Sequence, residues 1–281
     1  MPALAPPDPR ARPVAVFDSG VGGLTVLHEL LVSLPQEDYL YLGDDARFPY
    51  GDRSPGELRA FALEIADALL ERGAKVIVIA CNSATAAALE TLREHVGEEV
   101  DVVGVIAPAA QLAAQATHNG RVGLLATPAT VASGAFEGAL RAADPLVRLL
   151  SVPCPDLSAV IQSDAPVTED VVTLARGYCR DLRKAGVDTV VLGCTHYPLV
   201  RPLLQRLLGP GVRLVSAGQG VARRVEHALA ARGLARQGSE EGDYRFLCTG
   251  EPERFRAMAT RVLQLPVGAV ERARLPVAAA T

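Results

Sequence analysis

Short apolar runs, rich in β-branched residues, alternate along the chain with longer segments in which apolar positions recur every three to four residues. The runs predict strands buried on both faces, and the longer segments predict helices between them. Strands are expected at 14–18, 39–43, 76–80, 102–106, 122–126, 149–152, 189–193, 212–216 and 244–248. The clearest helices are expected at 55–72, 168–185 and 218–232. This alternation is typical of an α/β protein with parallel sheets.

Two segments share one layout. "KVIVIACNSATAAALETL" starts at residue 75 and "DTVVLGCTHYPLVRPLL" at residue 188, and each runs from strand to cysteine to helix. This pseudo-repeat predicts two pseudosymmetric lobes, each a parallel sheet flanked by helices, with the active site in the cleft between the lobes.

The expected lobes are discontinuous in sequence. The chain is divided into a flexible N-terminal tail at 1–13, a first α/β lobe at 14–104 plus 217–270, a second α/β lobe at 105–216 and a loose C-terminal tail at 271–281. Asp18 and Cys81 fall in the first lobe, and Cys194 and His196 fall in the second.

Composition restricts the class of partner. The chain has 281 residues, 49% hydrophobic, and a net charge of -4 with both signs scattered, which argues against nucleic acid and anionic membranes as partners. The longest apolar stretches, such as 76–81, are far shorter than the roughly 18 residues of a membrane span. Five widely spaced cysteines without a CxxC motif indicate a reducing cytoplasm and no metal site. A small-molecule substrate is expected.

Polar residues follow several of the predicted strands. In parallel α/β sheets the ligand binds beyond the carboxyl ends of the strands, so these residues are the candidates for a site. They occur in "DSGVGGLTV" with Asp18 and Ser19, "GDDARFPYG" with Pro49, Tyr50 and Gly51, "ACNSA" with Cys81, Asn82 and Ser83, "ATPAT" with Thr127 and Thr130, and "CTHYP" with Cys194, Thr195 and His196. The glycines after Asp18 let backbone N–H groups approach an anion.

Two of the cysteines stand out from the others. Cys154, Cys179 and Cys248 fit the role of small core residues. Cys81 and Cys194 instead fall at the N-terminus of a predicted helix, whose positive dipole end and unpaired N–H groups favour the thiolate. His196 could relay the proton of Cys194, as Asp18 could for Cys81 if the first and third strands are adjacent.

Two thiols in one cleft allow disulfide exchange, metal binding, acyl transfer or proton transfer on opposite faces of one carbon. Exchange commonly uses CxxC spacing, a soft metal requires more ligands, and acyl transfer leaves the second cysteine without a role. Proton transfer on both faces, which inverts a stereocentre, uses both. Lys75 and Lys184 each precede a strand, so neither is placed to form a Schiff base at the cleft, and no cofactor is expected.

The motifs "FDSGVGGLTVL", "YLGDDARFPYG", "IACNSATAAAL", "GVIAPA", "VGLLATPATV" and "LGCTHYPLV" closely resemble those of bacterial glutamate racemases, over about residues 14–255. The resemblance implies a cofactor-independent, usually homodimeric enzyme that interconverts L- and D-glutamate and supplies D-glutamate for peptidoglycan. It also implies that Cys81 and Cys194 are the catalytic acid and base, assisted by Asp18 and His196. The residues expected to hold glutamate are Asp18, Ser19, Pro49, Tyr50, Gly51, Asn82, Ser83, Thr127, Thr130, Thr195 and His196.

The chain departs from the family pattern at two positions. Ser83 stands where most relatives have threonine, which keeps the hydroxyl. Gln162 stands where relatives commonly have a glutamate that supports the second cysteine and the histidine. Gln162 cannot ionise. Either Asp164 or Glu169 replaces the missing acid, or the protonation of the groups on the Cys194 side of the site is controlled differently.

Two other functions are compatible with the sequence. One is a related enzyme that acts on another acid, such as an aspartate racemase or a decarboxylase of the same superfamily. The other is a catalytically silent module that binds amino acids or regulates, because two lobes around an anion-binding cleft also describe binding proteins.

Overall fold

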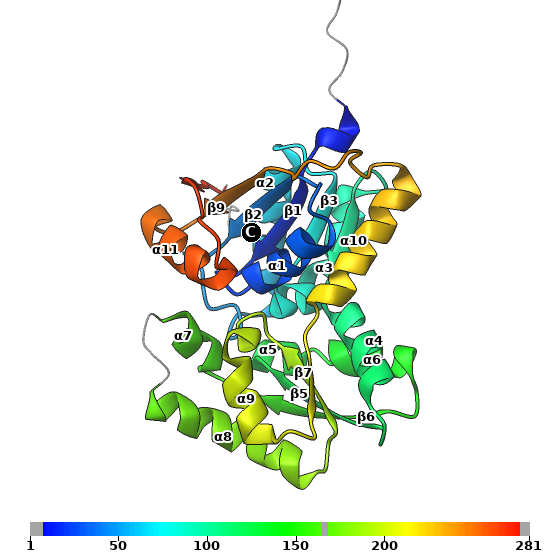
Figure 1. Cartoon of the computed structure of the whole chain (residues 1–281), viewed down its shortest axis with the longest axis vertical. Helices are drawn as coiled ribbons and strands as arrows, with labels where there is room; N and C mark the ends of the chain where they lie inside the picture. The colour runs from blue at the N-terminus through cyan, green and yellow to red at the C-terminus, as the bar shows by residue number, and fades with distance from the viewer. Residues whose placement is uncertain (1–7, 164–167, 276–281) are drawn as a thin grey trace, which may run out of the picture.

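The computed structural model describes residues 8–163 and 168–275. Within them the chain forms two stacked lobes, each built on an all-parallel sheet (Figure 1). The first sheet has the order β10 (Val270–Arg272), β9 (Tyr244–Cys248), β2 (Tyr39–Gly43), β1 (Val14–Asp18), β3 (Val76–Ile79), β4 (Asp101–Gly104). The second has the order β6 (Arg148–Pro153), β5 (Arg121–Ala126), β7 (Thr189–Gly193), β8 (Arg213–Val215). The predicted α/β fold with two parallel sheets is confirmed.

Helices flank both sheets. The α-helices are α1 (Leu24–Ser33), α2 (Pro55–Leu70), α3 (Asn82–Val96), α4 (Ile106–Ala116), α5 (Pro128–Ala132), α6 (Ala135–Ala143), α7 (Leu157–Gln162), α8 (Glu169–Lys184), α9 (Arg201–Leu208), α10 (Gly218–Arg232) and α11 (Pro252–Leu263). Two short 3₁₀ helices are η1 (Pro9–Ala11) and η2 (Tyr197–Val200). None of the described helices has the length and apolarity that crossing a membrane would require.

Helices cover both faces of the first sheet. Side chains alternate along each strand, so each strand contributes to the core on both faces. On β1, Val14 and Val16 pack in the apolar cluster that contains the inner faces of α1 and α10. Ala15 and Phe17 point the other way, into a cluster with α2 and α3. The helices on both faces explain why β1 is a continuous apolar run.

The second lobe repeats this layering and is joined to the first. Leu125 and Val190 pack against α8 and α9 on one face of the sheet. Leu124 and Val191 pack on the other face, in the cluster that also contains α4, α6 and the α1 side of the first lobe. One apolar core therefore runs from lobe to lobe and joins the two sheets.

Both sheets present the carboxyl ends of central strands to the seam between the lobes (Figure 1). Ser19, Thr127 and Cys194 directly follow β1, β5 and β7, and Cys81 comes two residues after β3. All four residues line one cavity. This is the position at which parallel sheets bind ligands.

Each end of the chain is ordered further than the sequence predicts. Glu271 and Arg272, expected in the loose C-terminal tail, belong to β10, which pairs with β9. Such a short edge strand is held by backbone hydrogen bonds and has no apolar run to reveal it. At the other end, Arg10 in η1 accepts a hydrogen bond through its carbonyl oxygen from Lys75 Nζ, 2.6 Å away. The remaining parts of the expected tails, 1–7 and 276–281, lie outside the described residues.

Candidate active site

Cys81 occupies the N-cap of α3, two residues after β3 ends at Ile79. Its Sγ lies 3.8 Å from Ser19 Oγ. Burial and the charge of Asp18 raise the pKa of Cys81 to about 12, although the backbone N–H groups of Ala84 and Ser83 act in the opposite direction. The sequence predicts a thiol activated by the helix N-terminus, but desolvation outweighs that effect here and the thiol stays protonated at neutral pH.

Cys194 directly follows β7 in the second lobe, but the short 3₁₀ helix η2 comes next rather than the helix that the sequence predicts, and α9 begins only at Arg201. The Sγ of Cys194 lies 3.7 Å from Nδ1 of His196. Burial raises the pKa of the Cys194 thiol well above its ordinary value, and Cys81 and Asp18 raise it further when they are ionised, whereas the backbone N–H of His196 lowers it. Both thiols are therefore neutral at pH 7 in this structure.

Gln162 determines the tautomer of His196. Its Oε1 lies 3.3 Å from the backbone N of Val21 and 2.8 Å from Nε2 of His196. A backbone N–H can only donate, so the amide atom facing Val21 is the oxygen and His196 donates to it through Nε2. Nδ1 then presents its lone pair to Cys194 and can accept the thiol proton. Burial lowers the pKa of His196 to about 4, which keeps the ring neutral at pH 7.

The sequence offers Asp164 and Glu169 as replacements for the acid that is missing at position 162. Asp164 lies outside the described residues. Glu169 is exposed at the start of α8, and no contact between it and His196 is seen. The neutral amide of Gln162 is the group that contacts the imidazole, so this face of the site differs electrostatically from one that carries a carboxylate.

Asp18 ends β1 and is fully buried. Its Oδ2 accepts a hydrogen bond from the backbone N of Gly20 at 3.1 Å, and its Oδ1 accepts one from Thr195 Oγ1 at 3.1 Å. Burial raises the pKa of Asp18 to about 6, against the lowering effect of these hydrogen bonds. Strands β1 and β3 are adjacent, as the pairing of Asp18 with Cys81 requires, and Asp18 also bonds directly to the neighbour of Cys194.

Three hydroxyl groups join the lobes on the other side of the thiols. Ser83 Oγ lies 2.8 Å from Thr127 Oγ1 and 3.2 Å from Thr130 Oγ1, and the two threonine oxygens are 3.0 Å apart. All three residues are buried. A carboxylate could replace these mutual hydrogen bonds, because each hydroxyl can turn to donate to it.

The glycine loop after β1 packs directly on the second lobe. A Cβ added at Gly22 would lie 2.4 Å from Nδ1 of His196 and 2.5 Å from Oγ1 of Thr195, closer than any side chain can approach. Glycine is therefore required here by the backbone's approach to the imidazole.

The cavity between the thiols has a volume of about 10 Å³. This is close to the smallest space that holds one water molecule. Glutamate does not fit in it, so binding of an amino acid at this position requires the cavity to widen.

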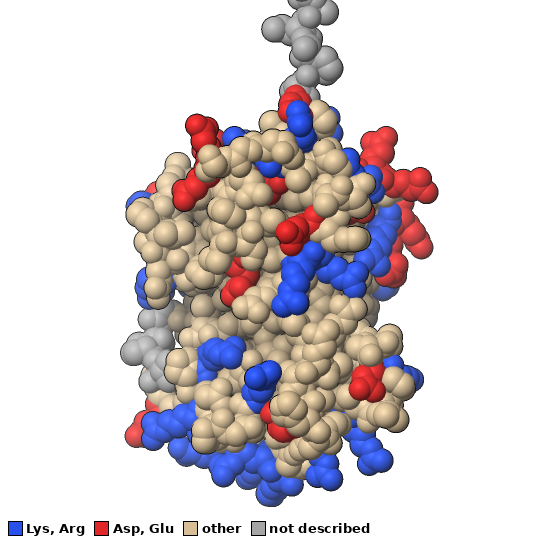
Figure 2. All heavy atoms as spheres, turned by 45° about the vertical axis from the view of Figure 1, so that its right-hand side comes forward, with Lys and Arg blue, Asp and Glu red and all other residues tan. Residues whose placement is uncertain are grey.

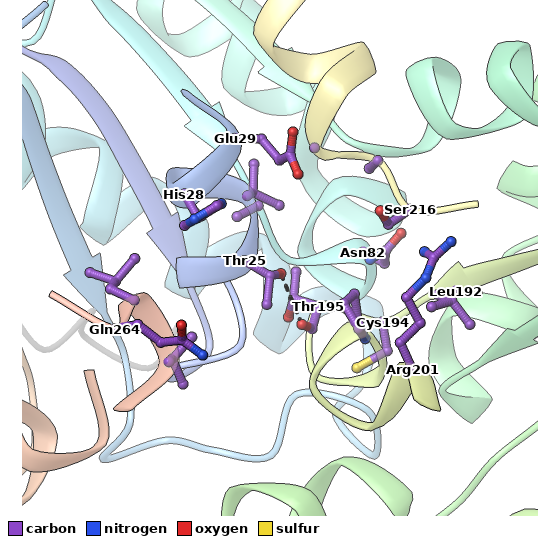
Figure 3. Close-up of a pocket in the computed structure, with 17 residues that line it drawn as sticks. Thr25, His28, Glu29, Asn82, Leu192, Cys194, Thr195, Arg201, Ser216 and Gln264 are labelled. Atoms are coloured by element: carbon purple, nitrogen blue, oxygen red, sulfur yellow. Dashed lines mark hydrogen bonds between the residues drawn. The ribbon is translucent and has the colours of Figure 1, made fainter. Parts of the chain in front are cut away.

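A second cavity, of about 320 Å³, lies beside the first on the side of α1 (Figure 3). Cys194 and Thr195 border both cavities, and Thr25 Oγ1 donates to the carbonyl oxygen of Thr195 at 3.0 Å across the lobes. The larger cavity lacks Cys81, Ser19 and the three hydroxyls, so the acid–base groups converge on the smaller one.

Comparison with known proteins identifies the family. A family model for Asp/Glu/Hydantoin racemases matches residues 24–225. The glutamate racemase of Beutenbergia cavernae is 45% identical over 261 residues, which cover 89% of this chain and 89% of the relative. The chain belongs to the glutamate racemase family.

Solved structures of glutamate racemases have the same architecture. The enzyme from Bacillus anthracis superimposes with a TM-score of 0.90 at 35% identity, covering 95% of this chain and 99% of the other. The enzyme from Francisella tularensis in complex with D-glutamate gives a TM-score of 0.86 at 30% identity, covering 94% and 98%. The two-lobe arrangement is thus that of the glutamate racemase family.

Most of the residues expected at the site are brought together. Those that line the smaller cavity are Ser19, Tyr50, Gly51, Cys81, Asn82, Ser83, Thr127, Cys194, Thr195 and His196. Asp18 and Thr130 reach it through hydrogen bonds to lining residues, while Pro49 lies between Phe48 and Tyr50 without lining it. Their functional roles remain predictions.

The cavity also includes three residues that the motifs did not single out: Phe48, Ser158 and Gly193. The Phe48 ring lies 5.4 Å from the His196 ring. A signal for Ser158 exists in the sequence, since it precedes Gln162 by four residues and shares its face of α7.

Proposed function

We propose that this enzyme interconverts L- and D-glutamate without a cofactor, using Cys81 and Cys194 to exchange protons with opposite faces of Cα. The observation that carries this proposal is that the two thiols come from different lobes and line the same cavity. The Francisella tularensis relative binds D-glutamate in its crystal structure, which supports the choice of substrate.

The reaction needs one thiolate and one thiol. The thiolate takes the proton from Cα, the C–H electron pair remains on the substrate, and the opposite thiol then donates its proton to the other face. The first cysteine ends as a thiol and the second as a thiolate, so exchange of one proton with solvent restores the starting state. The product has inverted configuration, and atoms and charge balance.

The neighbours of the thiols can generate that thiolate only when bound glutamate lowers the thiol pKa, because a histidine with a pKa of about 4 is a weak base. Nδ1 of His196 carries no proton and faces Cys194. Asp18 ends β1, which is adjacent to the strand that precedes Cys81, and it accepts a hydrogen bond from Thr195, the neighbour of Cys194. A substrate ammonium group brings a positive charge into the site, which lowers the thiol pKa when glutamate is bound. The low pKa of His196, about 4, makes its cation a strong acid that returns the proton readily.

Donors around the cavity are placed to hold the substrate carboxylates. The N-terminus of α3 directs backbone N–H groups at the position of Cys81, and the hydroxyls of Ser83, Thr127 and Thr130 are close by. Fixed dipoles of this kind stabilise the negative charge that develops at Cα in the transition state.

The lysines favour a cofactor-independent mechanism. Lys75 is buried and forms an ion pair with Glu37, with 2.5 Å between Nζ and Oε2. This pair lies at the end of the first sheet opposite the cavity, ahead of β3. Lys184 ends α8, ahead of β7. The chain has no other lysine that could form a Schiff base with a cofactor at the site.

In the cell, the enzyme is proposed to act in the cytoplasm as a homodimer and to supply D-glutamate for peptidoglycan. Light scattering of the purified protein tests the dimer. Depletion of the enzyme in its host, followed by rescue with D-glutamate, tests the supply role.

A chiral assay in deuterium oxide tests the mechanism. Wild-type protein without pyridoxal phosphate should convert L- to D-glutamate and label Cα of the product. Cys81→Ala and Cys194→Ala should each lose about 10²–10⁴-fold in rate, the usual contribution of a positioned acid or base. Aspartate, run in parallel, should be a poor substrate.

Cys179→Ala is the matched control. Cys179 is buried in α8 and does not line the cavity, so its loss should leave the rate unchanged. Turnover at the wild-type rate by Cys81→Ala would contradict the proposal. Tight glutamate binding without loss of optical rotation would instead identify a binding module.

A further inference from the structure

Asp44 lies at the carboxyl end of β2 and is fully buried. Its backbone N donates to the carbonyl oxygen of Asp18, 2.9 Å away, so it directly adjoins the candidate catalytic strand. Its carboxylate has three side-chain donors. Arg47 Nε lies 2.6 Å from Oδ2, the Tyr50 hydroxyl also donates to Oδ2, and Thr249 Oγ1 lies 2.7 Å from Oδ1.

Two of these donors, Arg47 and Tyr50, belong to residues 47–51, which form one wall of the site. Between Arg47 and Tyr50 lies Phe48, whose ring lies 5.4 Å from that of His196. Gly51 follows directly, and its carbonyl oxygen accepts a hydrogen bond from the backbone N of Ala129 in the second lobe at 3.1 Å. Phe48, Tyr50 and Gly51 all line the cavity, so the atoms that Asp44 holds lie directly behind surfaces that would contact the substrate.

The Tyr50 hydroxyl depends on Asp44 for its orientation, whereas Arg47 has further contacts. Tyr50 packs against Phe61 of α2, with 5.5 Å between ring centroids, but its only described hydroxyl partner is Asp44. Burial and the charge of Asp44 raise the pKa of Tyr50 well above its ordinary value, so the hydroxyl keeps its proton and donates it. Arg47 also pairs with Glu64 and lies 4.1 Å above the Phe61 ring.

We propose that Asp44 is a positioning residue for the reaction, which holds the wall formed by residues 47–51 in the geometry that binds glutamate. The inference rests on the proposed function. Asp44 acts through Tyr50 and the backbone that follows, and it does not itself line the cavity. A carboxylate is required because a neutral amide presents only one acceptor atom and would turn an NH₂ group toward one of its donors.

Glu37 supplies a control for a purely structural role. It lies just before β2, is also buried, and also holds a cation, Lys75. Its carboxylate otherwise accepts from the backbone N of Arg236, and it lies at the end of the sheet away from the cavity. Glu37→Gln thus removes a buried charge from the same lobe without touching the wall.

The experiment compares Asp44→Asn with Glu37→Gln in the full-length protein. Both should lower Tm. Only Asp44→Asn should raise KM for glutamate, by about tenfold, because weakening of a charge-assisted contact of this kind costs about one decade in binding. Its kcat should change less than its KM. Hydrogen exchange of the 44–51 backbone should rise in Asp44→Asn and stay unchanged in Glu37→Gln.

Thr249→Val provides a milder variant if Asp44→Asn does not fold. It removes only the hydroxyl that donates to Asp44 Oδ1 and accepts from the backbone N of Ala46, and it should raise KM about threefold. Equal KM values in wild type, Asp44→Asn and Thr249→Val, with unchanged exchange at 44–51, would overturn the proposal. A wild-type protein that does not racemise glutamate would refute the proposed function instead, and the exchange measurement would then decide whether Asp44 holds the wall.

Discussion

The imidazole of His196 is held by Gln162, with 2.8 Å between Nε2 and Oε1, and this bond leaves Nδ1 unprotonated and facing the thiol of Cys194. The same oxygen accepts a hydrogen bond from the backbone of Val21 in the other lobe. A single neutral amide therefore sets the tautomer of the candidate base and joins the two lobes beside it. The protonation equilibrium on this face of the site depends on that amide.

Gln162→Glu is expected to make His196 more basic. A carboxylate that accepts the Nε2 proton stabilises the imidazolium, so the pKa of His196 should rise from about 4 toward its ordinary value of 6.5. Imidazole resonances followed by NMR between pH 3 and pH 8 measure this directly. A His196 titration that is the same in both proteins would show that Gln162 does not control the ring.

The pH dependence of turnover should reflect Asp18. Burial raises its pKa from 3.8 to about 6, so the carboxylate is lost as the pH falls through 6. The expected result is a decline of kcat/KM below about pH 6, and Asp18→Asn should lack this decline and be slower by about 10²-fold or more. A profile that is flat from pH 7 to pH 5 in the wild type would exclude an ionised Asp18 from the mechanism.

The same acidification should also lower stability, through His196. The folded protein holds this ring neutral with a pKa of about 4, whereas the unfolded chain takes up a proton near 6.5. Stability is therefore lost as the pH falls from 6.5 to 4. Tm measured across this range should fall less steeply in His196→Gln, which cannot titrate, and parallel curves would contradict the assignment.

Gly22→Ala should damage the site through contact alone. The added methyl group would overlap Nδ1 of His196 and Oγ1 of Thr195, which forces the loop and the second lobe apart. We expect a loss of at least about 10²-fold in kcat/KM, since a displacement of about 1 Å has that effect on catalytic groups. Gly138→Ala is the control: it lies within α6 with nothing near its Cβ position, and it should gain about 0.5–1 kcal/mol of stability at unchanged rate.

The hydroxyl of Ser83 can be tested separately from its size. Ser83→Thr keeps the oxygen that contacts Thr127 and Thr130, and kcat/KM should stay within about threefold of wild type. Ser83→Ala removes the oxygen and should raise KM for glutamate by about tenfold, the effect of one lost hydrogen bond to a charged group. Equal KM values in the two variants would mean that this hydroxyl does not contact the substrate.

The sequence by itself determined the central elements of the fold. β1, β2, β7 and β9 and helix α10 have the bounds that the apolar pattern predicts. β1, β2 and β7 are buried throughout, and strands covered on both faces read as continuous apolar runs. It also placed the candidate residues at strand ends, since parallel topology puts those ends on one side of each sheet. β10 escaped prediction because it is a short edge strand that pairs with β9 and has no apolar run.

Only the tertiary structure decided what those residues contact and how they are charged. Cys81 and Cys194 share a cavity because the lobes face each other, and nothing local in either motif encodes that meeting. The helix N-terminus predicts a thiolate at Cys81, yet burial between the lobes keeps the thiol protonated. Likewise, the contact of Gln162 with both Val21 and His196 arises from packing between distant segments. Hydrogen bonding and desolvation depend on what surrounds a side chain in space, and the order of residues does not reveal those surroundings.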